Sequence, residues 1–321
     1  MASKHHLVAG GAGFIGVNLC RALLARGDRV SVIDNLSRGR EDWLQDISTD
    51  IGFLKADLAY ETAAKSAFDA VVGEQAIDAV WHLCANSDIA AGVADPKIDL
   101  RDTFLTTFHI LQNVRTQGIS RLHFASTSAV YGESVDAKPF SETDQTLPIS
   151  NYGAMKLASE AQIRAAVESG LQRANVFRFP NVIGPPATHG VIFDFLHKLA
   201  STPDRLDVLG NGTQQKPYLH VDELVEAMLF IADESNARYG LYNIGPRDQG
   251  VSVREIAEIV RNHAAPKAAI VYGLEDRGWV GDVPRFYYST SKLADLGWRP
   301  RLSSAEAVAR AVPMIAAGLK A

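Results

Sequence analysis

Short apolar runs alternate with longer stretches in which apolar residues recur at helical spacing throughout residues 1–178. The short runs are typical of buried strands and the periodic stretches of amphipathic helices. The predicted strands are His6–Gly10, Val30–Asp34, Ile51–Lys55, Ala79–Leu83, Leu122–Ser126 and Asn175–Arg178. The predicted helices are Phe14–Arg26, Glu61–Val72, Thr103–Thr116 and Met155–Ser169. This repetition predicts βαβ units, and therefore a Rossmann-type, doubly wound parallel sheet with helices on both faces.

The pattern changes after Phe179. Residues 180–220 are rich in proline and glycine, which predicts loops around a single helix at Ile192–Ser201. The α/β pattern then resumes with a helix at Val221–Asp233, a strand at Leu241–Ile244 and helices near Ser252–His263 and Ser303–Ala316. We expect a larger domain and a smaller α/β lobe. Their expected extents are residues 1–178, with returns of the chain near 218–245 and 287–300, and mainly residues 179–321.

The composition is that of an ordinary globular protein, with 47% apolar and 21% charged residues in a chain of 321. A net charge of −5 without a basic cluster argues against nucleic acid or an anionic membrane as a partner. No apolar run reaches the roughly 18 residues of a membrane span. Cys20 and Cys84 lack metal-ligand spacing, so we expect no metal site and reduced cysteines in a cytoplasmic protein.

A glycine-rich turn follows the first predicted strand. It reads Gly10-Gly11-Ala12-Gly13-Phe14-Ile15-Gly16 and runs directly into a predicted helix. Glycines at the first, fourth and seventh positions permit a tight turn, close approach of a pyrophosphate, and close packing of helix on strand. The amides at the start of the helix then face the phosphates. The turn therefore predicts dinucleotide binding by the larger domain.

Two acids follow the next strands. Asp34 ends the second strand, at a distance from the glycine turn that is typical of an acid binding the adenosine ribose. Such an acid repels a 2′-phosphate and favours NAD over NADP, whereas the nearby Arg38 could accommodate that phosphate. Asp34 could instead cap the following turn. Asp57, after the third strand, could meet the adenine or be a solvated turn residue.

Tyr152 and Lys156 are four residues apart, which places them on one face of a predicted helix. A tyrosine with its pKa lowered by a neighbouring ammonium and by the positive nicotinamide ring of the cofactor can take a proton from a substrate hydroxyl as a hydride leaves. Alone, the pair could equally be an ordinary surface pair. The hydroxyls of Ser126, Thr127 and Ser128 favour the chemical interpretation, because this segment ends a strand at the carboxyl edge of the sheet, where α/β ligands bind. Any of the three could instead be a turn residue.

These motifs together resemble the extended short-chain dehydrogenase/reductases, in their nucleotide-sugar epimerase/dehydratase branch and most closely the UDP-glucose 4-epimerases. The resemblance covers nearly the whole chain. The segments that carry it are Gly10–Gly16, Asp34–Ser37, Ser126–Gly132, Tyr152–Lys156, Arg178–Pro185, Gly210–Gln214, His220–Asp222 and Gly281–Asp282.

The resemblance implies an enzyme that epimerises a nucleotide-linked hexose of the UDP-glucose/UDP-galactose type. Tightly held NAD would oxidise C4 to a ketone, and the hydride would return to the other face. Thr127, Tyr152 and Lys156 would be catalytic, and the enzyme would be a homodimer.

The resemblance also implies two sets of binding residues. The cofactor set is Gly10, Gly13, Phe14, Ile15, Gly16, Asp34, Asn35, Ser37, Arg38, Gly39, Asp57, Leu58, Leu83, Cys84, Ala85, Thr103, Tyr152, Lys156 and Phe179. The substrate set is Ser87, Thr127, Ser128, Asn181, Val191, Lys216, Arg277, Asp282 and Phe286.

Departures from the family pattern narrow the reaction. Dehydratases of this family carry an Asp-Glu pair after the threonine, whereas this chain has Ser128 and Ala129, so the elimination lacks its acid and base. Lys216 replaces a usual phosphate-binding arginine and offers no bidentate fork, which leaves the exact substrate open. Phe286 either favours a plain hexose over an N-acetylhexosamine or packs with Tyr287 and Tyr288. The alternatives are a uronate epimerase, a dehydratase, a ketosugar reductase, or a non-catalytic dinucleotide sensor.

Overall fold

The computed structural model describes residues 3–133, 138–275 and 287–319. The chain forms two compact units that are interleaved along the sequence. Unit 1 consists of residues 1–130, 146–178 and 228–242, and unit 2 of residues 131–145, 179–227 and 243–321. In the described ranges, no helix is both long and apolar enough to cross a membrane.

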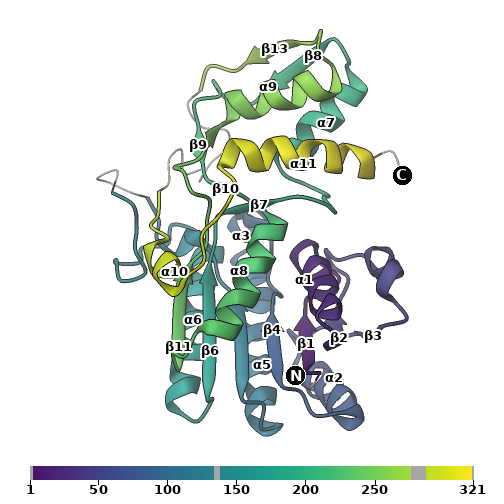
Figure 1. The fold of residues 1–321 in the computed structure, drawn as a ribbon, viewed down its shortest axis with the longest axis vertical. Helices are drawn as coiled ribbons and strands as arrows, with labels where there is room; N and C mark the ends of the chain where they lie inside the picture. Colours follow the sequence, from purple (N-terminus) through teal and green to yellow (C-terminus); the bar gives the residue numbers. More distant parts are fainter. Residues whose placement is uncertain (1–2, 134–137, 276–286, 320–321) are drawn as a thin grey trace. The chain divides into compact units, whose positions relative to one another are not determined.

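Unit 1 is built on a seven-stranded sheet in the order β11-β6-β5-β4-β1-β2-β3 (Figure 1). Its strands are β1 (His5–Ala9), β2 (Arg29–Asp34), β3 (Ile51–Lys55), β4 (Ala79–His82), β5 (Arg121–Ala125), β6 (Arg173–Arg178) and β11 (Tyr239–Asn243). The pairs that join the first six are all parallel. The predicted doubly wound sheet is therefore confirmed, with strand ends shifted by at most two residues.

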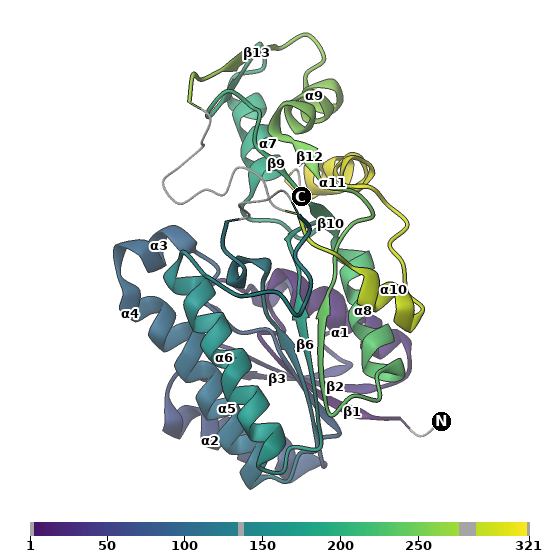
Figure 2. The same ribbon diagram turned by 90° about the vertical axis from the view of Figure 1, so that its left-hand side faces the viewer.

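Helices cover both faces of this sheet. Figure 2 shows α2, α5 and α6 along one face and α1 on the other. The helical elements are α1 (Phe14–Ala25), η1 (Glu41–Ile47), α2 (Glu61–Glu74), α3 (Ile89–Ala94), α4 (Pro96–Asp99), η2 (Leu100–Leu105), α5 (Thr106–Thr116), η3 (Ser128–Val130), α6 (Asn151–Glu168) and the end of α8 (Val221–Glu234). One core cluster joins Val80 and Phe124 of the sheet to Phe68, Ile110 and Ile163 of the covering helices.

Two helices of unit 1 differ from the prediction at their starts. Thr103–Thr116 is not one helix, because a π-helical turn (η2) precedes α5. The helix expected from Met155 begins at Asn151, since the Ser150 hydroxyl accepts a hydrogen bond from the Gly153 amide at 3.1 Å. This N-cap places Tyr152 in the first turn.

Residues 180–220 in unit 2 contain more structure than the predicted single helix. The helix α7 (Val191–Ser201) is present, and with it β7 (Asn181–Ile183), β8 (Arg205–Val208), β9 (Gln215–Lys216) and β10 (Tyr218–His220). β7 pairs with β10, β8 with β13 (Ala269–Tyr272), and β9 with β12 (Val251–Ser252). These strands have two to four residues and mostly distant partners, so local sequence pattern does not reveal them.

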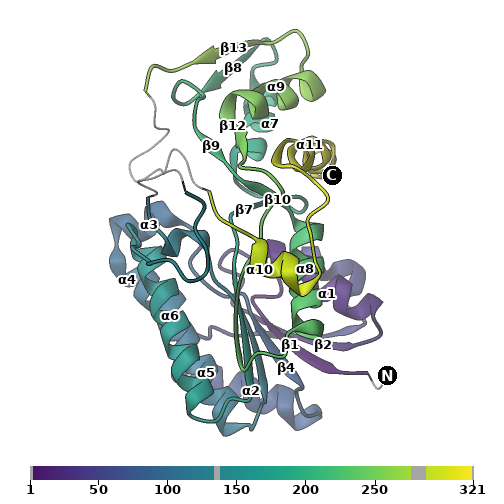
Figure 3. The ribbon, with the colours of Figure 1, turned by 60° about the vertical axis from the view of Figure 1, so that its left-hand side comes forward.

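The remaining helices of unit 2 are α9 (Val253–Ala264), α10 (Ser291–Leu296) and α11 (Ser304–Gly318). Apolar faces of α7, α9 and α11 form the core of this unit, beside the β8–β13 pair (Figure 3).

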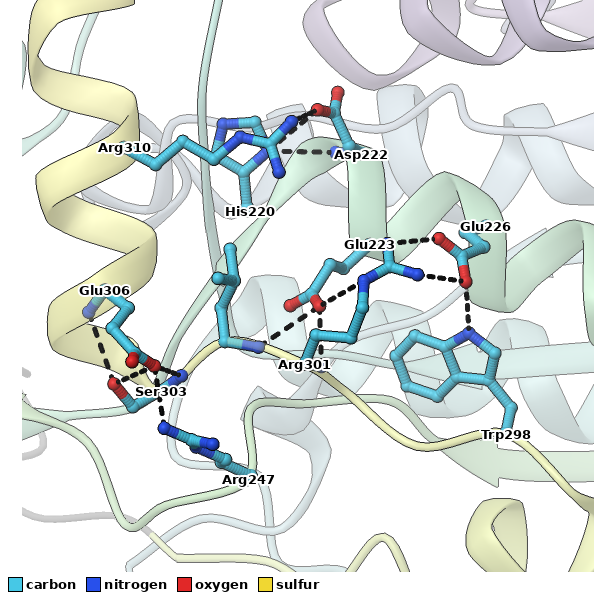
Figure 4. Close-up of polar contacts among 11 residues, drawn as sticks. His220, Asp222, Glu223, Glu226, Arg247, Trp298, Arg301, Ser303, Glu306 and Arg310 are labelled. Carbon is cyan, nitrogen blue, oxygen red and sulfur yellow. Dashed lines mark hydrogen bonds and ion pairs between the residues drawn. The ribbon is translucent and has the colours of Figure 1, made fainter.

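Side chains in the first turns of α8 bind the segment that leads into α11 (Figure 4). The buried Glu223 carboxylate accepts hydrogen bonds from the Arg301 and Leu302 amides at 2.7 and 3.2 Å. Glu226 binds the Arg301 guanidinium through both oxygens and accepts the Trp298 indole N–H. These contacts fix the path of residues 298–302 within unit 2.

Buried histidines lie among the strands of unit 1. The Trp81 indole donates to Nδ1 of His6 at 3.1 Å, and the His123 ring stacks on Trp81 with centroids 4.1 Å apart. Burial lowers the pKa of His6 and holds the pKa of His82 well below its usual value. Burial also lowers the pKa of His123 to about 3. These rings are therefore neutral in the folded protein at neutral pH.

Acid should destabilise the protein through these histidines. Unfolding lets each ring take up a proton below its ordinary pKa of about 6.5. For His123, the contribution to stability is therefore fully present above that pH and falls between about pH 6.5 and 3. For each neutral ring, the fall approaches about 1.4 kcal/mol per pH unit. The free energy of unfolding, measured in urea at several pH values in this range, should change less steeply with pH for His123→Phe than for wild type. The phenylalanine ring keeps the stack on Trp81. Equal slopes for both proteins would contradict this assignment.

Candidate active site

The glycine turn between β1 and α1 is shaped by backbone packing. Gly10 has φ +84°, and a Cβ there would lie 2.9 Å from the Cys84 nitrogen. A Cβ on Gly16 would lie 2.2 Å from the Gly10 carbonyl oxygen, whereas one on Gly13 would meet that oxygen alone, at 3.3 Å. Gly10 and Gly16 are therefore required by packing within the protein, and Gly13 leaves one side of the turn open.

The turn runs directly into α1 at Gly13. Gly13 is the N-cap of this helix and provides no side-chain cap. The amides of Phe14, Ile15 and Gly16, in the first turn, are of the kind that bind phosphate at a helix N-terminus. The turn thus fits the pyrophosphate of a dinucleotide.

Gly16→Ala should weaken NAD binding at least about tenfold and lower stability by about 1–3 kcal/mol, because the new methyl group meets backbone atoms. Gly73→Ala in α2 is the matched control. A Cβ there has no neighbour within 4 Å, so this variant should bind NAD normally and gain up to about 1 kcal/mol. Calorimetric titration and urea unfolding measure both effects. Equal behaviour of the two variants would show that packing at Gly16 is unimportant.

Asp34 lies at the end of β2, where it is 7% exposed. Its two carboxylate oxygens accept the Ala12 amide at 3.0 Å and the Leu36 amide at 2.8 Å. Burial raises the pKa of the Asp34 carboxyl, and these two hydrogen bonds oppose the rise. The residue does cap the next turn, and it also supports the glycine turn. Each oxygen retains further acceptor capacity, so binding of the ribose stays compatible with this arrangement.

The polar side chains around Asp34 have partners within unit 1. Arg38 forms an exposed ion pair with Asp88 at 2.6 Å, which engages the guanidinium that could have met a 2′-phosphate. Asn35 accepts the Ser37 amide at 2.9 Å, and Asp57 accepts the Ala59 amide at 3.0 Å. Asp57 is thus a turn residue, and its contact with adenine stays a prediction.

Other predicted cofactor residues occupy the same carboxyl edge of the sheet. Gly39 packs on Ala12, since a Cβ on Gly39 would lie 2.8 Å from its carbonyl carbon. Leu83, Cys84 and Ala85 follow β4, where the Leu83–Cys84 backbone packs against Gly10.

Two further predicted cofactor residues are buried in unit 1. Leu58 belongs to the core cluster, and Thr103 accepts the Asn86 amide at 3.2 Å. Phe179 is assigned to unit 2.

Tyr152 and Lys156 occupy the first turns of α6. The Lys156 side chain is buried, and its Nζ donates to the Ala125 carbonyl at 2.6 Å. The same nitrogen lies 4.6 Å from the centre of the Phe124 ring and 5.9 Å from that of the Tyr152 ring. The predicted pairing of Tyr152 and Lys156 on one helix face is therefore present.

Burial raises the pKa of Tyr152 to about 12, and a hydrogen bond with the Thr127 hydroxyl opposes this rise. Burial also lowers the pKa of Lys156 to about 7. Among the protein groups, burial therefore has the largest effect on the pKa of Tyr152. The expected lowering by Lys156 together with the positive nicotinamide ring stays a prediction.

A buried network that the sequence did not indicate supports this pair. Glu160, four residues after Lys156, binds the Arg178 guanidinium through both carboxylate oxygens at 3.0 and 2.6 Å. The Ser126 hydroxyl also donates to Glu160, so Ser126 is a supporting residue next to Thr127. The available signal was the repeat of Tyr152, Lys156 and Glu160 at intervals of four residues along one helix face.

The predicted substrate residues are distributed over both units. Unit 1 holds Thr127, the exposed Ser87, and Ser128 in η3. In unit 2, Asn181 begins β7, Val191 begins α7, and Lys216 ends β9. Arg277, Asp282 and Phe286 lie outside the described residues. The alternative aromatic cluster at Phe286 is also untested, although the Tyr288 hydroxyl donates to the Ile244 carbonyl at 2.7 Å. All these substrate roles stay predictions.

Comparison with known proteins places these features in context. The chain is 29% identical to the UDP-glucose 4-epimerase of Halalkalibacterium halodurans, over 94% of this chain and 92% of that one. The UDP-glucose 4-epimerase of Thermotoga maritima, solved with UDP-glucose, is 27% identical with a TM-score of 0.87, covering 98% of this chain and 100% of that one. The Thermus thermophilus UDP-glucose 4-epimerase, solved with NAD, is 28% identical with a TM-score of 0.85, covering 97% and 99%. Residues 6–245 match the NAD dependent epimerase/dehydratase family, and the chain therefore belongs to this family.

Proposed function

We propose that the protein epimerises C4 of a nucleotide-linked hexose of the UDP-glucose/UDP-galactose type, using bound NAD. The observation that carries the proposal is the placement of Thr127, Tyr152 and Lys156 at the carboxyl edge of a sheet that also bears the glycine turn. The relatives named UDP-glucose 4-epimerase support this reaction. Ser128 and Ala129 stand where a dehydratase needs an acid and a base, which favours epimerisation.

The residues of unit 1 fit NAD. Gly13 and the first amides of α1 would hold the pyrophosphate, and Asp34 would hold the adenosine ribose. When bound, NAD⁺ would accept a hydride from C4, return it to the other face, and carry the positive charge that favours ionisation of Tyr152. We assign unit 1 to the cofactor and, through Asn181, Val191 and Lys216, unit 2 mainly to the nucleotide-sugar.

Residues of the chain itself accept and return the proton of the sugar 4-hydroxyl. Tyr152, once ionised, accepts the proton of the sugar 4-hydroxyl, while Thr127 hydrogen-bonds at the same oxygen. Lys156 stabilises the phenolate as an ammonium whose position is fixed by the Ala125 carbonyl. Tyr152 returns the same proton when the ketone is reduced, so the cycle has no net consumption of acid, base or reductant.

The test is to incubate the purified protein with UDP-, GDP-, CDP- and dTDP-hexoses, UDP-N-acetylglucosamine and a UDP-uronate, and to follow the sugars by NMR. One series has no added cofactor, and a second has stoichiometric NADPH. C4 epimers of a UDP-hexose are expected. A 4-keto-6-deoxy sugar would indicate a dehydratase, a C4 epimer formed only from a UDP-uronate would indicate a uronate epimerase, and turnover only with stoichiometric NADPH would indicate a reductase. Bound NAD with no turnover of any substrate would indicate a sensor. Equal turnover of UDP-glucose and UDP-N-acetylglucosamine would contradict the role proposed for Phe286.

Asp34→Ala should weaken NAD binding about 10–100-fold, because a charged acceptor for the ribose hydroxyls is removed. Asp95→Ala is the matched control, since Asp95 also accepts a backbone amide two residues along the chain but belongs to no proposed binding set, and the affinity of this variant for NAD should be unchanged. Titration calorimetry of the cofactor-free proteins measures both affinities. An unchanged affinity for Asp34→Ala would remove this residue from the cofactor site.

We also propose that the protein is a cytoplasmic homodimer. Leu100 and Phe108, at the start of η2 and in α5, are 45% and 39% exposed and offer apolar surface for a second copy. Both cysteines are free thiols, which is usual in a reducing compartment. Sedimentation velocity with a Phe108→Asp variant would test the assembly, since a dimer mediated by this surface should dissociate.

A further inference from the structure

Asp99, the last residue of α4, is a carboxylate enclosed in unit 1 with 0% exposure. Its Oδ1 accepts the Asn86 side-chain amide at 2.9 Å, and Oδ2 accepts no hydrogen bond from any residue that the structure describes. A Cβ built on Gly92 would lie 1.8 Å from Oδ2, so the carboxylate packs directly against the Gly92 backbone. Within the described ranges, this carboxylate is thus held in place without a cation bound to it.

The carboxylate adjoins the first turn of α6. The Asn151 side-chain amide donates to the Gly92 carbonyl at 2.9 Å, and Asn151 immediately precedes Tyr152. Helix α4, which ends at Asp99, packs against α6. In keeping with this packing, the Asp99 charge raises the pKa of Tyr152 and of Lys156, as the smallest of the contributions to each. Lys156 in turn lowers the pKa of Asp99, which burial raises.

Lys156 is a buried cation without a bound counter-ion. Its hydrogen-bond acceptor, the Ala125 carbonyl, is neutral, and among the described residues it forms no ion pair. The other carboxylate that acts on it, Glu160, is already neutralised by the bidentate contact with Arg178. Asp99 is therefore the nearby negative charge that is not balanced by another cation.

The other ionisable groups described around Lys156 and Asp99 do not provide an unbalanced negative charge. Cys84 acts on Lys156 but stays a neutral thiol, because burial raises its pKa. His82 is neutral for the opposite reason, since burial and Lys156 hold its pKa well below its usual value. Asp102, whose charge raises the pKa of Asp99, forms an ion pair with Arg101. Asp88, at the start of α3, forms an ion pair with Arg38.

We propose that Asp99 is a positioning residue of the active site, whose unbalanced carboxylate keeps the buried Lys156 side chain an ammonium while Tyr152 handles the substrate proton. This proposal rests on the proposed function. It explains why a carboxylate is kept out of water with one oxygen unpartnered, an arrangement that is unfavourable for stability alone. It also explains its proximity to a lysine whose burial otherwise favours the uncharged amine.

The test is the pH dependence of kcat for the holoenzyme with a UDP-hexose, compared between wild type, Asp99→Asn and Asp102→Asn. Removing the Asp99 charge makes both Tyr152 and Lys156 lose protons more readily. Both limbs of the pH profile should therefore move to lower pH, because the Asp99 charge raises the pKa of each group. At a fixed pH on the alkaline limb, kcat should fall about threefold or more. Asp102→Asn should leave both limbs in place.

An Asp99→Asn enzyme with a lower kcat but unmoved limbs would overturn the proposal, because that is the result of a purely structural role. A second measurement does not need turnover. Urea unfolding of Asp99→Asn, Lys156→Met and the double variant forms a cycle, in which coupled charges predict that Asp99→Asn costs less stability when Lys156 is absent. Additive effects would equally overturn the proposal. If wild type lacks epimerase activity, this cycle still decides the charge pairing, so the two failures are distinguishable.

Discussion

Tyr152→Phe is expected to lower kcat by about 10³-fold or more while leaving NAD bound, because phenylalanine keeps the ring and removes the group that moves the substrate proton. The ring contact with Lys156 Nζ, 5.9 Å from its centre, does not depend on the hydroxyl. Turnover measured by NMR and cofactor content measured after denaturation separate the two effects.

Tyr60→Phe is the matched control for this prediction. Tyr60 is 54% exposed and precedes α2, so loss of its hydroxyl should leave kcat unchanged. Activity of Tyr152→Phe within tenfold of wild type would exclude the tyrosine as the base and would leave water or another side chain in that role.

Glu160→Ala is expected to cost about 3–5 kcal/mol of folding stability. The substitution leaves the Arg178 guanidinium buried without its bidentate partner, and it also removes the acceptor of the Ser126 hydroxyl. The urea midpoint should fall strongly, and the activity of the remaining folded protein should fall as well, because Ser126 precedes Thr127.

Two variants isolate the cause of that loss. Glu168→Ala, on the same helix, removes an exposed partner of Arg164 and should change stability by less than about 0.5 kcal/mol. Glu160→Leu combined with Arg178→Met removes both charges and should recover much of the stability lost by Glu160→Ala. A large effect of Glu168→Ala, or no recovery in the double variant, would contradict the buried-pair explanation.

The first 178 residues could be predicted well because their strands and helices are long enough to show a period. The strands of the parallel sheet follow apolar runs, and Gly10, Gly13 and Gly16 occupy the expected turn between β1 and α1. The Tyr152–Lys156 pair could be predicted for a similar reason, since a spacing of four residues has a definite geometric meaning on a helix.

Features that depend on distant partners could not be predicted in this way. The strands β7 to β10 have two to four residues and gain their order from pairing. The ionic partner of Glu160 lies 18 residues away on a strand, and the amide that binds Asp99 comes from a loop 13 residues earlier. The burial that shifts the pKa values of Tyr152 and Lys156 also depends on packing, which composition and spacing do not specify.

The edge strand β11 has a consequence for any attempt to isolate the larger unit. It comes from residues 239–243, beyond a long stretch of unit 2, and is the neighbour of β6 in the sheet. The Ala174 amide donates to the Arg238 carbonyl at 2.8 Å at the start of this pairing. A fragment ending at residue 178 would leave β6 as a bare edge with its backbone groups open to strands of other molecules. Such a fragment should aggregate, although it contains the glycine turn and the first six strands of the sheet.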